Sequence, residues 1–160
     1  MDTTTILAAV FFSLLPISEL RGAIPFAVIR GMDLFTAALL CTAVNAMVPI
    51  LAFVFLSTFH RFLYRFAWYK KFFDRFVEKT RRKVHKQVEK FGYWGLLFFV
   101  AIPFPVTGAW TGALGAWILG MEKKKAILAI AGGVIVAGII VTVLVGLWGT
   151  GTKNIFFKTF

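Results

Sequence analysis

Glu19 and Arg21 are the two residues of this chain whose chemistry is hardest to reconcile with their surroundings. They lie inside the apolar stretch Leu14–Met32, which hydropathy alone would place in a membrane. A charge at bilayer depth costs roughly 2.5–3.5 kcal/mol on insertion scales, so such residues normally face a protein interior or a water-filled cavity. A guanidinium can bind a phosphate or carboxylate in bidentate fashion. The pair therefore indicates anion recognition, proton exchange at the glutamate, or a structural ion pair.

Helix breakers divide the chain around these two charges. The apolar segment Ile6–Leu15 is too short to cross a bilayer, which needs about 20 helical residues, and Pro16 follows it directly. We expect Ile17–Arg21 to form an unwound elbow and Gly22–Ile29 to run back as a second short helix. The sequence thus predicts a re-entrant hairpin, and a single kinked span over Ile6–Ile29 is the alternative.

The composition defines the class of protein. The chain has 160 residues, 59% of them hydrophobic and 19 of them Phe, which exceeds the averages of soluble domains. Four long apolar stretches predict an all-α integral membrane protein, and the length suggests one membrane domain over residues 1–160.

The positive charge is concentrated in the middle of the chain. The net charge is +11, and eleven of the 18 Lys and Arg residues lie between Arg61 and Lys90. Such clustering is typical of cytoplasmic segments, so we predict no nucleic-acid partner. Within residues 59–91 apolar residues recur three or four apart, which predicts a basic amphipathic helix on the inner leaflet. It would serve as an anchor or, alternatively, bind a regulatory partner.

Two stretches are long enough to cross the bilayer. They are Thr36–Leu56, which contains Asn45 and Pro49, and Ala126–Trp148. We expect the proline to kink the first span and the asparagine to form a hydrogen bond between helices. Three glycines of the second span predict close helix approach: Gly132, Gly133 and Gly138.

A second copy of the same pattern follows the basic segment. Tyr93–Ile102 is short and apolar, prolines and Thr107 make a second elbow, and Gly108–Leu119 runs back to Gly120 and Met121, as the first copy does to Gly31 and Met32. The halves are residues 6–58 and 93–148, and one full span separates their starting points. This order predicts an inverted-topology repeat of two re-entrant hairpins, each followed by a transmembrane helix.

Charge favours this topology over four ordinary spans. With two hairpins, fourteen of the Lys and Arg residues other than Arg21 lie inside and three outside, whereas four spans would give thirteen and four. We therefore predict a plasma-membrane protein with a cytoplasmic basic segment and both termini outside.

Inverted repeats with broken helices place the binding site near the midplane, between the halves. The second arm of each hairpin would direct free N–H groups and a positive helix end, near Gly22 and Gly108, into that site, where an anion is favoured. Glu19 would exchange a proton or form an ion pair with the arginine. The predicted substrate-binding residues are Glu19, Arg21, Gly22, Thr107, Gly108 and Thr111.

The chain resembles the small multidrug export protein family, which is itself similar to the larger DedA or VTT-domain superfamily. The likeness rests on SELRGAIP at Ser18–Pro25 and IPFPVTGAWTGALGA at Ile102–Ala116. It implies opposed re-entrant hairpins and membrane transport, and for the wider superfamily the movement of polyprenyl phosphates or phospholipids. Typical DedA members carry arginines in the second hairpin, and this chain has none there.

Three functions follow from these observations. The first is a transporter or flippase for an amphipathic anionic substrate, such as a lipid phosphate, with proton coupling as a further hypothesis. The second is a proton-coupled exporter of hydrophobic compounds, and the third is a membrane scaffold that does not transport. We expect no enzyme, cofactor or metal, because no phosphate loop, metal-ligand cluster or nucleophile and base grouping is present. We expect a homodimer in the bilayer.

Overall fold

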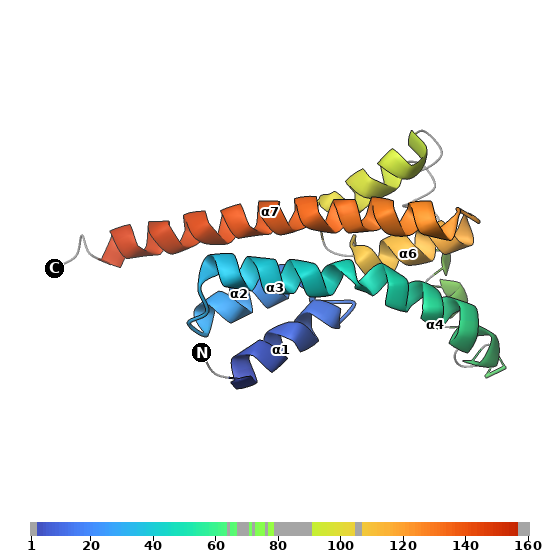
Figure 1. The fold of residues 1–160 in the computed structure, drawn as a ribbon, viewed down its shortest axis with the longest axis horizontal. Helices are drawn as coiled ribbons and strands as arrows, with labels where there is room; N and C mark the ends of the chain where they lie inside the picture. Colours follow the sequence, from blue (N-terminus) through green and yellow to red (C-terminus); the bar gives the residue numbers. More distant parts are fainter. Residues whose placement is uncertain are drawn as a thin grey trace.

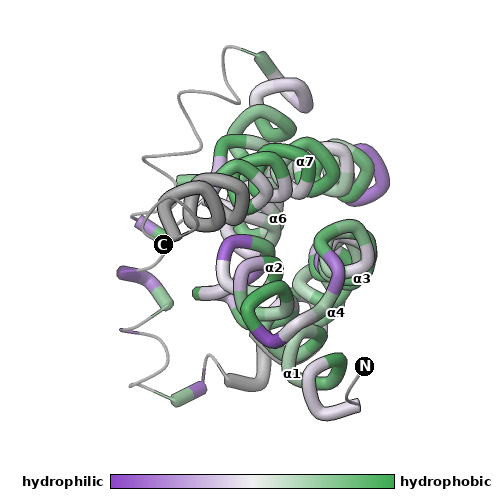
Figure 2. The backbone as a smooth tube through the Cα atoms, turned by 90° about the vertical axis from the view of Figure 1, so that its left-hand side faces the viewer, coloured by the Kyte–Doolittle hydropathy of each residue, from purple (hydrophilic) through white to green (hydrophobic). Residues whose placement is uncertain are grey.

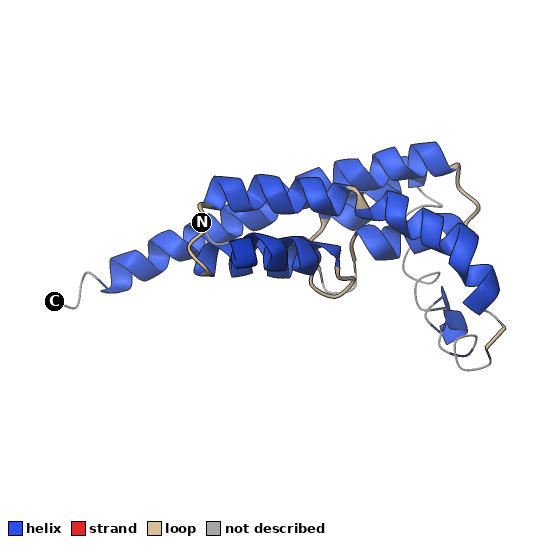
Figure 3. Ribbon diagram, turned by 60° about the horizontal axis from the view of Figure 1, so that its bottom comes forward, coloured by secondary structure: helices blue, strands red, loops and turns tan. Residues whose placement is uncertain are grey.

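The computed structural model describes residues 3–63, 65–66, 71, 73–75, 77–78, 91–104 and 107–156. Every regular element of this part is a helix (Figures 1 and 3). A helix Phe91–Ala101 lies between α4 and α6 in the chain. The labelled elements are α1 (Thr3–Leu14), α2 (Glu19–Ile29), α3 (Leu34–Ala46), α4 (Val48–Leu63), α6 (Ala109–Ile118) and α7 (Lys123–Phe156).

Two long helical rods form the frame of the molecule. Leu34–Thr58, which joins α3 to α4, and Lys123–Trp148 of α7 are each long and apolar enough to cross a membrane. The first rod breaks at Met47, two residues before Pro49, which confirms the predicted kink. The rods pack against each other, and their chain directions are opposite (Figure 1).

Short helices pack on this frame in two pairs. α1 and α2 contact each other and α3, and α2 also contacts α7. α6 packs between α4 and α7 in the other half of the molecule (Figure 1). It forms the second helix pair with the helix Phe91–Ala101, whose Val100 lies beside Gly112. Seen end-on, α2 lies between α7 and α1, and α3 lies beside it (Figure 2). Its position explains why Ala23, Ile24 and Ala27 are fully buried.

The outer surface of α7 is apolar. Many of its large apolar side chains are exposed, and much of the helix has the hydrophobic colour (Figure 2). Soluble monomers rarely expose large apolar patches. Together with the two long apolar helices, this surface agrees with an all-helical membrane protein. The exposed side chains include Leu128, Ile135, Ile139, Val143 and Leu147.

α2 and α6 end with the same backbone motif. Gly31 and Gly120 have φ of 87° and 66°, the left-handed region that favours glycine. In each case the following methionine N–H bonds five residues back, from Met32 to Ala27 and from Met121 to Ala116. The Gly-Met pairs of the two sequence repeats therefore have the same structural role: each ends a short helix just before a long one begins.

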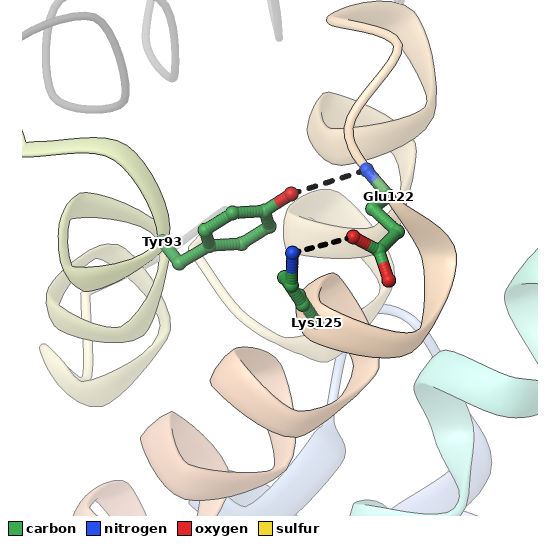
Figure 4. A network of polar contacts seen from close by, with 3 residues as sticks. All are labelled: Tyr93, Glu122 and Lys125. Carbon is green, nitrogen blue, oxygen red and sulfur yellow. Dashed lines mark hydrogen bonds and ion pairs between the residues drawn. The ribbon is translucent and has the colours of Figure 1, made fainter.

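A polar contact joins the two ends of the second helix pair. The backbone N–H of Glu122, just before α7, donates to the Tyr93 hydroxyl at 3.3 Å, and Lys125 pairs with the Glu122 carboxylate at 2.7 Å (Figure 4). Tyr93 stands near the start of the helix Phe91–Ala101. The chain therefore leaves this region, turns at the second elbow, and returns to the same place.

Helix contacts predicted from small and polar residues are confirmed. The Asn45 side chain donates to the Ser13 carbonyl of α1 at 3.0 Å, so it does join two helices. A Cβ at Gly133 would lie 2.6 Å from the Leu97 carbonyl, and one at Gly138 would overlap Thr42. Glycine at these positions lets α7 approach its neighbours closely.

Most of the predicted amphipathic segment, residues 59–91, lies outside the described residues. Phe73 is described and is only 8% exposed. It packs with Leu56 of α4 and Leu114 of α6. The centres of its ring and of the Trp117 ring are 6.4 Å apart, and the two ring planes make an angle of 77°.

Candidate substrate site

The first elbow is shorter than the sequence predicts. Residues 15–18 connect α1 to α2, and α2 begins at Glu19, so both charged residues belong to its first turn rather than to unwound chain. Glu19 has φ of 44°, which is uncommon for a residue other than glycine. Such strain persists only where the surroundings enforce it, and it is concentrated at functional sites.

Side chains from three elements satisfy the carbonyls that α1 leaves free where it ends. Ser18 Oγ donates to the Phe12 carbonyl at 3.0 Å, and Asn45 donates to the Ser13 carbonyl. The Trp110 indole N–H, from α6, donates to the Leu14 carbonyl at 2.9 Å. Without water, unpaired carbonyls at a helix end cost several kcal/mol each, so these bonds make a broken helix tolerable inside a membrane.

Trp110→Phe tests this satisfaction of the helix end, since it removes the indole donor and keeps an aromatic ring. We expect the free energy of unfolding in detergent to fall by about 0.6–2 kcal/mol, the range for hydrogen bonds between membrane helices. Trp94→Phe is the matched control because Trp94 is 69% exposed. Equal effects of the two substitutions would show that the bond to α1 contributes nothing.

The Glu19 carboxylate crosses to the second helix pair. Its two oxygens accept hydrogen bonds from the backbone N–H groups of Ala109 and Trp110, each at 3.3 Å, at the N-terminus of α6. Gly108 makes the room, because a Cβ there would overlap the carboxylate. The glutamate is 8% exposed and fills a position that the helix dipole makes favourable for an anion. The expectation that this helix end is free for a substrate is therefore wrong.

Arg21 also crosses between the elbows. Its guanidinium donates to the carbonyls of Phe104 and Thr107 and to Thr107 Oγ1, the last at 3.0 Å. Thr107 Oγ1 in turn lies 2.8 Å from the Ile102 and Phe104 carbonyls, which fixes its position. Within the described part of the chain, no ion pair joins Arg21 to Glu19. Both residues instead bind the second elbow at separate points.

A groove opens beside the guanidinium. It has a volume of about 330 Å³, and α2, the second elbow and α7 form its walls. Among the described residues of its lining, Arg21 is the only charged one, and the others are apolar or aromatic. We call it the open groove, lined by Arg21, Pro25, Pro103, Val141, Leu144, Val145 and Trp148.

The predicted site residues take different places around this groove. Arg21 lines it, Thr107 holds Arg21, and Gly108 packs on Glu19. Gly22 lies inside α2 and its N–H donates to the Ser18 carbonyl at 3.0 Å, so the predicted free N–H at this position is wrong, since the helix starts three residues earlier. Thr111 is buried in α6 and does not line the groove.

Sequence reasoning missed Trp110 and the α7 wall of the groove. The α7 residues of the wall occupy positions i, i+3, i+4 and i+7, which form one face of a helix: Val141, Leu144, Val145 and Trp148. That spacing is visible in the sequence, but nothing in it shows which of the apolar faces lies next to Arg21. Among the described residues, no group of His, Cys, Asp or Glu could hold a metal ion.

In the part of the chain that the structure describes, these features define a helical membrane protein in which Arg21 borders an apolar groove. Residues 19–140 match the model of the family described as "Putative small multi-drug export protein", so the chain belongs to this family. Searches of curated proteins and of solved structures found no match. The wider likeness to DedA proteins stays a prediction.

Proposed function

We propose that this protein is a membrane transporter that moves an amphipathic anion, such as a polyprenyl phosphate or another phospholipid. The observation that carries the proposal is the open groove, whose described lining combines the charged Arg21 with apolar walls. A headgroup phosphate would bind the guanidinium, which presents several donors in a planar fork. The family to which the chain belongs supports transport in general.

The groove suits a molecule with one charged end. Its α7 wall runs for two helical turns from Val141 to Trp148, about 10 Å at 1.5 Å per residue. A volume of about 330 Å³ holds a headgroup and the first part of a hydrocarbon chain, and the rest of the chain would remain in lipid. The binding free energy would come from the charge-assisted contact and from the burial of apolar surface.

In this proposal the two helix pairs are re-entrant hairpins of an inverted repeat. Three observations support it: Arg21 in the first turn of α2 contacts Thr107 of the second elbow, Tyr93 bonds to Glu122 where the second pair begins and ends, and Ile17 at the first elbow is 96% exposed. An exposed isoleucine at the tip is favoured in lipid. The charge distribution supports a cytoplasmic basic segment and termini that both lie outside, in the plasma membrane.

Val145→Trp tests the groove without changing its charge. The larger side chain fills the space beside Arg21, so we expect transport of a polyprenyl phosphate in proteoliposomes to fall about tenfold, equivalent to about 1.4 kcal/mol. Val143→Trp is the matched control, because Val143 lies on the same helix but is 54% exposed. The proposal is contradicted if both variants transport at the rate of the unmodified protein.

The family description favours a second candidate, a proton-coupled exporter of hydrophobic compounds with Glu19 as the exchange site. The same vesicles distinguish the two functions. Proton release that depends on an added hydrophobic cation, and that Glu19→Gln abolishes, would support the exporter. The scaffold hypothesis concerns the basic segment, and full transport by a protein lacking that segment's charges would remove it.

A further inference from the structure

The open groove has a structural counterpart in the other half of the chain. Residues that make equivalent backbone hydrogen bonds at the ends of α2 and α6, and at the starts of α3 and α7, stand 89 positions apart. This constant offset extends the sequence repeat to individual residues. The equivalent pairs are Ala27 and Ala116, Met32 and Met121, and Ala37 and Ala126.

The offset relates the groove to a filled interface. Pro25 of α2 and Val145 of α7 line the open groove, and their equivalents are Leu114 of α6 and Leu56 of α4. The helix pairs correspond as well, since α2 contacts α7 and α6 contacts α4. Leu114 and Leu56 are nevertheless 4% and 7% exposed, because the side chain of Phe73 packs on both.

Phe73 is the component that the open groove lacks. It comes from the middle segment, which has no equivalent in either repeat, and its ring packs edge-on against Trp117. Its neighbours Lys71, Asp74 and Arg75 are exposed, and Val77 of the same segment packs against the cluster that Phe73 forms with Leu56 and Leu114. An aromatic ring of this size fills the space that a lipid chain would occupy on the other side.

We infer that the α4–α6 interface is a second groove for the same substrate and that Phe73 closes it while the first groove is open. The inference rests on the proposed function and adds its gate. Transport requires that the site open alternately to the two sides, and an inverted repeat supplies two equivalent openings. In the described conformation one groove is open and the other is closed, and withdrawal of Phe73 would accompany the reverse arrangement.

Cysteine accessibility tests the gate. Cys41 is the single cysteine of the chain and is buried, so Cys41→Ala provides a background without thiols. Leu114→Cys reports on the closed groove and Val145→Cys on the open one. Each introduced cysteine is labelled with a membrane-impermeant maleimide, in vesicles that make both membrane faces of the protein accessible to the reagent. The rates are compared with and without Phe73→Ala, and Phe66→Ala is the control because Phe66 is an exposed aromatic residue of the same segment.

We expect Phe73→Ala to raise the labelling rate at Leu114→Cys at least about tenfold and to lower it at Val145→Cys, because removing a buried ring destabilises only the closed conformation of its groove. Phe66→Ala should change neither rate. Phe73→Leu keeps an apolar side chain, so it should raise the labelling rate at Leu114→Cys by less. This variant keeps the test valid if Phe73→Ala fails to fold.

An unchanged rate at Leu114→Cys, or an equal rise at both reporters, would overturn the inference. The labelling needs no substrate, so its outcome is separate from the transport assays. If the labelling rates change as expected but no anionic lipid is transported, the proposed function is wrong and the gate stands. If an anionic lipid is transported but the labelling rates do not change as expected, only the gate is wrong.

Discussion

Replacement of Arg21 by Ala is expected to lower the transport of a phosphorylated lipid by about ten- to a hundredfold, the equivalent of the 1.5–3 kcal/mol that a hydrogen bond to a charged group contributes. Arg21 is the only cation among the described residues that line the open groove, so the substitution removes the charged partner that they offer to a phosphate. The measurement is the rate of polyprenyl phosphate translocation in proteoliposomes, repeated with common anionic phospholipids to separate the two kinds of substrate.

Two further variants separate binding from structure. Arg30→Ala removes an exposed cation from the end of the same helix, where it lies 5.6 Å from the centre of the Phe26 ring, and should transport normally. Thr107→Val removes one acceptor of Arg21 and leaves the groove charge in place, so it should cost stability more than transport. If Arg21→Ala transports every tested lipid at the normal rate, the anion site does not exist.

Gly108→Ala is expected to lower the free energy of unfolding by about 2–4 kcal/mol, because a Cβ there displaces a buried, hydrogen-bonded charge. The new methyl group would lie 2.6 Å from Glu19 Cδ, so the carboxylate must leave the Ala109 and Trp110 N–H groups. The start of α6 then loses its partner in a buried position, where the unpaired N–H groups are costly. Thermal unfolding in detergent measures the loss.

A double-mutant cycle assigns the cause. In a Glu19→Ala background the carboxylate is already absent, so Gly108→Ala should cost much less than in the unmodified protein, with a coupling of about 1–3 kcal/mol. Gly132→Ala is the control, since its Cβ would meet only the end of the Leu97 side chain, at 3.2 Å. Strict additivity of Glu19→Ala and Gly108→Ala would show that the two residues do not act together.

The backbone of this protein was largely predictable because the signals that shape it are local. A proline removes an N–H and ends the short helix before it, which located the first elbow to within a few residues. The Gly-Met pairs gave the ends of α2 and α6, and hydropathy gave both long helices. The start of α2 was misplaced, since Glu19 enters the helix through a backbone conformation that the sequence does not announce.

The partners of the two charges were not predictable. Glu19 and Arg21 stand two residues apart, so their mutual pairing was a reasonable hypothesis, but both bind groups 83 to 91 positions away in the chain. Such contacts depend on how the helix pairs dock against one another. Their docking is decided by many small packing contacts, such as those of Gly133 and Gly138, rather than by any motif.

The sequence by itself determined that the chain is a membrane protein of broken and unbroken helices with a repeated plan, because hydropathy and helix breaking act over a few residues. Only the tertiary structure decided that the N–H groups at the start of α6 bind the Glu19 carboxylate and that the Arg21 guanidinium borders an apolar groove. It also decided that Phe73 packs at the interface of α4 and α6, which is equivalent to that groove in the other half. The physical reason is that burial and hydrogen bonding between distant segments depend on their final positions, which no local pattern records.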